Sequence, residues 1–113
     1  MEILTFDELR NPNNSVEFEG GDHGGTDVSF FVLDFEHGRG PSLHKHDYAE
    51  VCILLEGQAT FHGPDGDVEV GAGHVVVVPA GEPHAFESSS DRPLRQVNIH
   101  VSPRLISQWL DEG

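Results

Sequence analysis

The stretch from Gly38 to Gly57 constrains the fold of this chain most, because it places three strong metal ligands beside a short apolar run. His44, His46 and Glu50 are good ligands for a divalent transition metal. Side chains alternate along a strand, so all three point the same way if one strand runs unbroken through these positions. On a helix, residues two apart lie on different faces, and the two histidines do not easily reach one ion. The apolar run 51–55, ended by a glycine, favours the strand. The stretch therefore predicts a metal site built on β-structure.

The rest of the chain reads mostly as short strands separated by turn residues. Strands are expected at 16–19, 27–36, 84–87 and 94–101, and this pattern is typical of a sandwich or barrel. Residues 103–111 are the one exception, because a capping serine and a proline precede apolar residues at helical spacing. We expect a short C-terminal α-helix there, packed on the outside of the barrel through Leu105, Ile106, Trp109 and Leu110.

Length and composition narrow the class of protein. At 113 residues, the chain is expected to form a single domain, 1–113. Twenty acidic residues against six basic ones give a net charge of −14, which argues against binding nucleic acid or an anionic membrane. The sequence has no apolar run long enough to span a bilayer and no secretory signal, so a cytoplasmic location is expected. The single cysteine, Cys52, excludes a disulfide framework and is expected to be a small buried residue, with a cavity-facing position as the alternative.

A fourth ligand follows a rigid turn, and with it a family resemblance emerges. His84 comes after Pro79-Ala80-Gly81-Glu82-Pro83. The chain resembles the cupins, whose first motif combines a glycine, His-x-His, a glutamate and a second glycine, and whose second motif combines a glycine, Pro-x-Gly and a histidine. The matching residues span the motif core 38–88 and are Gly38, His44, His46, Glu50, Gly57, Gly73, Pro79, Gly81 and His84. Ser88 stands where the family usually has an asparagine.

The resemblance implies an all-β fold, an antiparallel jelly-roll β-barrel with a metal inside. If the family's metal ligands are assigned to the matching positions of this sequence, the ligands are His44, His46, Glu50 and His84. Three imidazoles and one carboxylate suit one divalent transition metal, and we expect Fe(II) before Mn(II), Ni(II) or Zn(II). In an octahedral site, these four ligands leave two positions open for a substrate, water or dioxygen.

Cupins host many reactions, so the fold alone does not choose the function. We expect a metal-dependent enzyme acting on a small molecule, dioxygenase-like before isomerase, lyase or cyclase. The alternative is a non-catalytic ligand-binding or sensor cupin. Glu50 and Tyr48, which share strand parity, are candidate catalytic residues. His100 is a third candidate, because with Gln96 and Asn98 it gives the last strand a polar face that looks either to solvent or into the barrel.

The segment 27–36 also predicts a partner. Its apolar residues occupy both strand faces, with Val28, Phe30 and Val32 on one and Phe31, Leu33 and Phe35 on the other. A strand that is apolar on both faces is covered on both faces. In so small a domain, a second copy of the chain is expected to supply one covering, as a homodimer.

Overall fold

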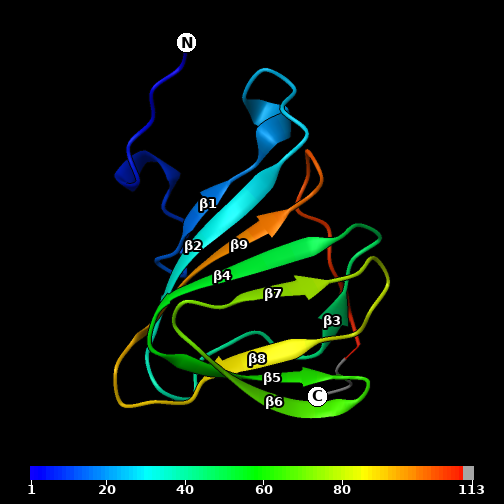
Figure 1. Cartoon of the computed structure of the whole chain (residues 1–113). Helices are drawn as coiled ribbons and strands as arrows, with labels where there is room; N and C mark the ends of the chain where they lie inside the picture. The colour runs from blue at the N-terminus through cyan, green and yellow to red at the C-terminus, as the bar shows by residue number, and fades with distance from the viewer. Residues whose placement is uncertain (111–113) are drawn as a thin grey trace.

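Two antiparallel sheets face each other in the computed structural model, which describes residues 1–110 (Figure 1). The larger sheet has the order β1-β2-β9-β4-β7, the smaller has β6-β5-β8, and β10 pairs with β3 beside them. The elements are η1 (Asp7–Leu9), β1 (Val16–Phe18), η2 (Gly20–Asp22), β2 (Ser29–Phe35), β3 (His44–Lys45), β4 (Glu50–Glu56), β5 (Gln58–Gly63), β6 (Gly66–Gly71), β7 (Val75–Val78), β8 (Ala85–Ser88), β9 (Leu94–His100) and β10 (Gln108–Trp109). The predicted antiparallel jelly-roll fold is confirmed.

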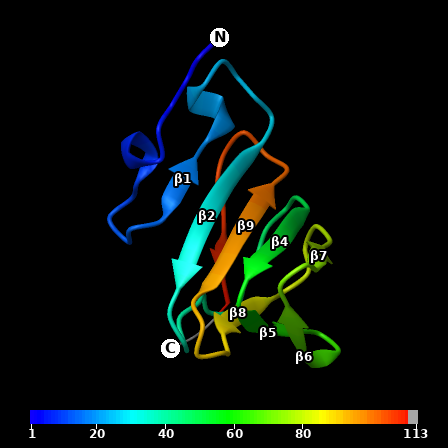
Figure 2. The same ribbon diagram turned by 60° about the vertical axis from the view of Figure 1, so that its left-hand side comes forward.

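The register of the larger sheet decides which side chains face the barrel interior. Glu50 of β4 lies opposite His100 of β9 and Val78 of β7, and His100 lies opposite Ser29 of β2. All four are buried, so the alternate residues of these strands point inward. Figure 2 shows β2, β9 and β4 side by side across this sheet. The opposite, outward face is apolar, with Val51, Ile53, Val75, Val77, Val97 and Ile99.

The hydrophobic core lies between the two sheets, away from the polar end of the barrel. It is one cluster of buried residues drawn from both sheets: Leu33, Phe35, Cys52, Leu54, Ala59, Phe61, Phe86 and Leu94. Phe86 of β8 stacks against Phe61 of β5 at 5.2 Å between ring centroids and against Phe35 of β2 at 6.3 Å. Because these aromatic contacts join the sheets at one end, the space at the other end is left to polar residues.

Two motif glycines occur where the chain turns. Gly57, between β4 and β5, has a φ of +80°, and a Cβ there would lie 2.6 Å from the Pro93 carbonyl oxygen. Gly38 has a φ of +83° after β2. Glycine adopts this left-handed backbone without steric cost, so the motif glycines shape the loops around the ligands.

The predicted C-terminal helix is wrong. Within residues 1–110, the helical elements are two 3-10 turns of three residues each, η1 and η2. Residues 108–109 form strand β10, which pairs antiparallel with β3, and the Leu110 amide donates to the Leu43 carbonyl at 3.0 Å. An isolated helix this short is marginal, whereas the extended backbone bonds directly to β3. Residue 111 of the predicted helix lies outside the described residues. In the part described, no helix has the length and apolar character needed to cross a membrane.

Candidate metal centre

Four side chains from three separate parts of the chain converge at the polar end of the barrel. One ligand atom from each of His44, His46, Glu50 and His84 lies within 4.8 Å of the others, and all four residues are buried. His44 belongs to β3, Glu50 begins β4, and His84 precedes β8. An isolated bridge between His44 and His84 joins the two histidine segments, with amide-to-carbonyl distances of 3.0 and 2.9 Å. The structure therefore brings together the four residues that the resemblance implied.

The local backbone differs from a single unbroken ligand strand. β3 ends at Lys45, and the chain bends through residues 47–48 before β4 starts at Glu50. The His46 carbonyl accepts the Gly81 amide at 2.7 Å, which ties this bend to the second motif. His46 and Glu50 therefore meet through the bend and not through the simple alternation of one strand.

Each candidate histidine ligand is oriented by a backbone carbonyl. His44 Nδ1 lies 2.7 Å from the Ser42 oxygen, His46 Nδ1 lies 2.8 Å from the Ile106 oxygen, and His84 Nδ1 lies 2.9 Å from the Glu82 oxygen. A carbonyl only accepts, so each Nδ1 carries a proton, and Nε2 is the ring nitrogen left to bind a metal. This second set of hydrogen bonds is typical of metal-bound histidines. His46 Nε2 is buried and makes no well-aligned hydrogen bond, although the Glu50 carboxylate lies 2.9 Å away, and this also fits two ligands that face one ion.

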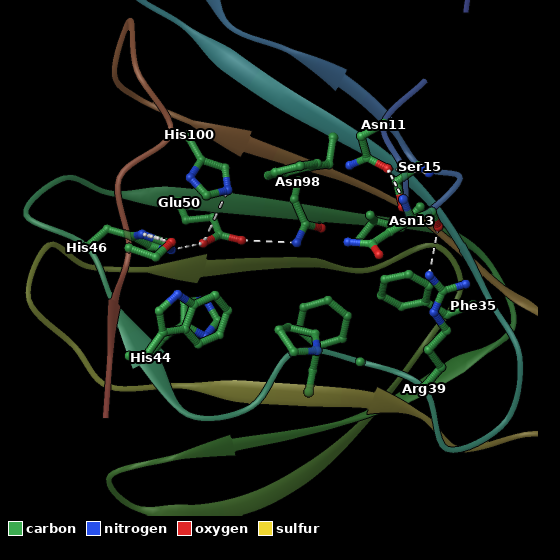
Figure 3. A pocket seen from close by; sticks show the side chains of 17 residues that line it. Asn11, Asn13, Ser15, Phe35, Arg39, His44, His46, Glu50, Asn98 and His100 are labelled. Carbon is green, nitrogen blue, oxygen red and sulfur yellow. Dashed lines mark hydrogen bonds and ion pairs between the residues drawn. The ribbon is translucent and has the colours of Figure 1, made fainter. Parts of the chain in front are cut away.

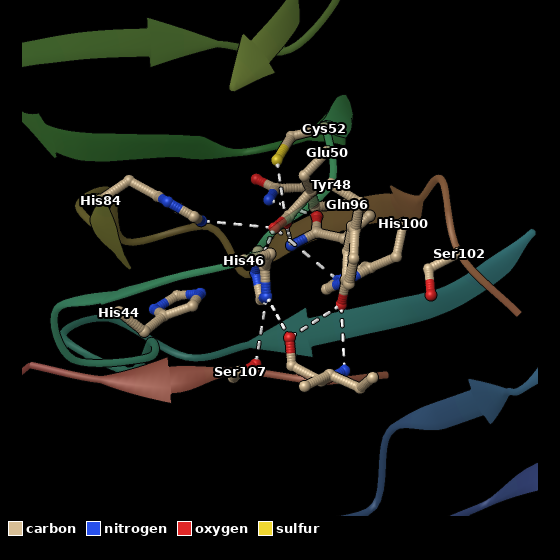
Figure 4. A network of polar contacts seen from close by, with 12 residues as sticks. His44, His46, Tyr48, Glu50, Cys52, His84, Gln96, His100, Ser102 and Ser107 are labelled. Carbon is tan, nitrogen blue, oxygen red and sulfur yellow. Dashed lines mark hydrogen bonds and ion pairs between the residues drawn. The ribbon is translucent and has the colours of Figure 1, made fainter. Parts of the chain in front are cut away.

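Glu50 lies at the centre of a buried network (Figure 4). One carboxylate oxygen, Oε1, lies 2.9 Å from His46 Nε2 and 3.3 Å from His84 Nε2. The other oxygen, Oε2, accepts the Asn98 side-chain amide at 3.0 Å and lies 3.5 Å from the Cys52 thiol. Burial opposes ionisation of this carboxyl, but the imidazoles around it outweigh burial and hold the pKa of Glu50 well below its usual range. The Glu50 side chain is therefore an ionised carboxylate that can bind a cation.

His100 and Tyr48 border this cluster. His100 Nε2 lies 3.7 Å from Glu50 Oε1, and His100 Nδ1 lies 2.8 Å from the Tyr48 hydroxyl. Burial lowers the pKa of His100 to about 4, so this imidazole is neutral near pH 7. Burial likewise raises the pKa of Tyr48, which keeps its proton. Of the two options left open for the last strand, the cavity-facing one holds, since Gln96, Asn98 and His100 are all buried.

The C-terminal segment completes the centre, and the sequence did not reveal this. Ile106 supplies the carbonyl that orients His46 and also contacts the Tyr48 hydroxyl through both its amide and its carbonyl at 3.1 Å. The Trp109 ring lies 4.9 Å from the His44 ring. A backbone carbonyl leaves no trace in a residue pattern, so only the fold could place Ile106 here.

A cavity of about 400 Å³ opens beside the candidate ligands (Figure 3). His44, His46, Glu50 and His100 line one part of it, and Phe31, Leu33, Phe35 and Phe86 supply an apolar lining. Arg39 and the loop residues Asn11, Asn13 and Ser15 also line it. A volume of this size is typical of small-ligand sites. The arrangement can hold a small molecule next to a metal.

The comparisons with known proteins agree with this geometry. A family model described as an AraC-like ligand binding domain matches residues 29–113. The chain belongs to this family. A double-stranded β-helix protein from Klebsiella pneumoniae superposes with a TM-score of 0.75 at 18% identity, over 96% of this chain and 90% of that one. A cupin superfamily protein from Desulfitobacterium hafniense gives 0.63 at 19% identity, over 69% and 70% of the two chains. These likenesses show the fold, and the predicted cupin resemblance is confirmed.

Two further similar proteins carry names that refer to oxalate. An oxalate-binding protein from Thermotoga maritima is 29% identical over 73 residues, which cover 64% of this chain and 60% of that protein's length. An oxalate decarboxylase from Bacillus subtilis with Mn(II) centres gives a TM-score of 0.68 at 23% identity, over 76% of this chain and 24% of that one. The fold and the cluster of four possible ligands together indicate a cupin that binds a divalent metal.

Proposed function

We propose that this domain is a metal-dependent enzyme acting on a small organic acid or another oxygen-rich, enolisable molecule. The observation that supports this most is the set of three histidines whose Nδ1 atoms are held by carbonyls, which leaves their Nε2 atoms and the Glu50 carboxylate to bind an ion beside the cavity. A divalent ion bound there would act as a Lewis acid on substrate oxygens and, as Fe(II), would support a dioxygenase-like reaction. Fe(II) is our first choice of metal, before Mn(II), Ni(II) or Zn(II). Isomerase, lyase and cyclase activities are the alternatives within the enzyme class.

The protein's own residues supply binding and proton handling in this proposal. His44, His46, Glu50 and His84 hold the ion. The Tyr48 hydroxyl and His100, 2.8 Å apart, form a short hydrogen-bonded chain next to the carboxylate of Glu50. The neutral imidazole of His100 can accept a proton from a substrate at Nε2, and the imidazolium that results is stabilised by the Glu50 carboxylate at 3.7 Å and by the Tyr48 oxygen next to Nδ1. We therefore assign His100 as the candidate proton-transfer residue and Tyr48 as the residue that positions it.

Metal loading followed by turnover tests this proposal. After reconstitution with Fe(II) or Mn(II), wild-type protein should hold about one ion per chain, and His46→Ala should hold far less. Loaded protein is then assayed with 2-oxo acids, diketones and catechols, following oxygen consumption and product by mass spectrometry. Tyr48→Phe keeps the ring that stacks on His46 at 4.9 Å, so it should keep the metal and lose turnover. Less than about a tenth of an equivalent of any metal, or turnover unaffected by metal removal, would refute the proposal.

A second candidate function is binding without turnover. The AraC-like ligand binding domain family and the oxalate-binding relative favour it. In that case, the metal and cavity would hold an organic acid that is released unchanged. Saturable binding in equilibrium dialysis, with the compound recovered intact after prolonged incubation under air, would favour this function over the enzyme.

A further inference from the structure

The cavity beside the metal centre has two unlike ends. His44, His46 and Glu50 lie at one end and Arg39 lies at the other, beside Phe35, with Asn98 between the two ends in Figure 3. Within residues 1–110, Arg39 is the one lysine or arginine that lines this cavity. The chain has 6 basic and 20 acidic residues, so a guanidinium group at a cavity wall is unusual here, and it favours the binding of an anionic group.

Arg39 is held over the cavity by contacts that leave its charge unpaired. Its guanidinium carbon lies 4.7 Å from the centre of the Phe35 ring, a cation–π contact. Nη2 donates to the Asn13 carbonyl at 2.8 Å, which uses one of the five guanidinium N–H groups. Among the described residues, no carboxylate forms an ion pair with it. The guanidinium is thus pre-oriented by neutral partners and keeps donors for a ligand.

The wall between the two ends is mainly apolar and long. Phe31, Leu33, Phe35 and Phe86 line it. Phe35 pairs with Leu94 and Ser29 pairs with His100, so six residue steps of β9 separate the level of Phe35 from that of Glu50. At about 3.3 Å per step, this corresponds to roughly 20 Å of strand. Because the side chains point into the cavity, the gap between the functional groups at its two ends is shorter than this. A two-carbon acid such as oxalate cannot bridge the two ends.

We propose that the cavity accepts an elongated amphipathic organic acid, with oxygen donors at the metal end, an apolar middle and an anionic group paired with Arg39. Arg39 is then a specificity-determining residue, because it selects ligands by their length and by the charge at their far end. This inference rests on the proposed function, since the metal end is the site described above.

A series of α,ω-dicarboxylates of increasing length is a direct probe. Oxalate, succinate, adipate, suberate and sebacate differ only in the number of methylene groups between two carboxylates. Trp109, the single tryptophan, lines the cavity, so its fluorescence reports occupancy without any need for turnover. We expect metal-loaded protein to bind the longer diacids more tightly than oxalate, because only these reach Arg39.

Arginine variants separate this inference from a general charge effect. Arg39→Gln should weaken binding of the long diacids roughly 10- to 100-fold and leave oxalate binding within about twofold. Arg39→Lys keeps the charge without the fork of donors and should lose less. Arg92→Gln removes one positive charge from an exposed loop outside the cavity and should behave as wild type. Equal binding of suberate by Arg39→Gln and wild type would overturn the inference.

Measuring metal content first distinguishes the two proposals. If the protein loads metal and Arg39→Gln changes nothing, the inference fails and the proposed function stands. If the protein binds no metal, the proposed function fails, and octanoate is titrated into wild type and Arg39→Gln instead. In that case, loss of octanoate binding in the variant supports Arg39 as the anion site, and unchanged binding or no binding to wild type overturns it.

Discussion

Asn98 offers a sharp test of how the metal centre is built. It is 4% exposed, its amide nitrogen donates to Glu50 Oε2 at 3.0 Å, and its oxygen accepts the Gln96 side-chain amide at 2.6 Å. Asn98→Leu replaces the side chain with an apolar one of similar size. The change removes the carboxylate's only nitrogen donor on Oε2 among the described residues and leaves the Gln96 donor buried without a partner.

The expected size follows from these two losses. A hydrogen bond to a charged group contributes about 1.5–3 kcal/mol, and an unsatisfied buried donor costs about 1–3 kcal/mol. The free energy of unfolding of the metal-free protein should therefore fall by about 3 kcal/mol or more. Metal affinity should fall roughly 10- to 100-fold, because Asn98 orients a ligand without touching the ion.

Two measurements check this prediction. Urea unfolding of the metal-free protein gives the stability, and competition with a chromophoric chelator gives the metal affinity. Gln96→Leu is the matched control, because it removes the second link and leaves the bond from Asn98 to Glu50, so its metal affinity should fall less. If Asn98→Leu keeps both the wild-type unfolding midpoint and the wild-type metal affinity, Asn98 does not position Glu50 and the reasoning is wrong.

Three further predictions concern other parts of the molecule. The pKa of His62 is raised by Asp67 at 2.6 Å and Glu87 at 2.7 Å. The ion pairs of protonated His62 therefore stabilise the folded state fully below the unfolded-state pKa of 6.5, and this stabilisation is lost as pH rises through the higher folded-state pKa. His62→Gln should thus lower the free energy of unfolding, measured in urea, by roughly 0.5 kcal/mol at about pH 5.5 and leave it unchanged at about pH 9; an equal loss at both would contradict this. The expected homodimer remains a prediction: with Val77 64% exposed on the apolar sheet face, light scattering should give a dimer mass for wild type and a monomer mass for Val77→Glu, and a monomeric wild type would refute it. Cys52 is 0% exposed, so a thiol reagent should label it only in denaturant, and rapid labelling of native protein would contradict the packing described above.

Much of the centre could be predicted because it depends on spacing along the chain. His44, His46 and Glu50 occur within seven residues, and Pro79 and Gly81 mark the turn before His84. These residue types have few other reasons to occur in such a pattern. The inward position of His100 was left open, because a polar strand face reads the same whether it meets solvent or a polar cavity.

The C-terminal segment shows where the pattern misleads. Apolar residues at 105, 106, 109 and 110 follow helical spacing, yet residues 108–109 form β10 and Ile106 is 63% exposed. The competing force is backbone pairing with β3 together with the carbonyl that Ile106 presents to His46. Backbone hydrogen bonds to a distant strand leave no periodic signal in the segment that makes them.

By itself, the sequence determined the fold class and the identity of the candidate ligands, because alternation, turn residues and ligand chemistry are local properties. Only the tertiary structure decided what those ligands share. It paired His84 with His44 in a β-bridge. It also placed the Asn98 amide within hydrogen-bonding distance of Glu50, and the His100 ring within hydrogen-bonding distance of the Tyr48 hydroxyl. It also set Arg39, in the loop after β2, over the Phe35 ring at the end of that strand. Such contacts depend on sheet register and loop paths, which many weak interactions determine together.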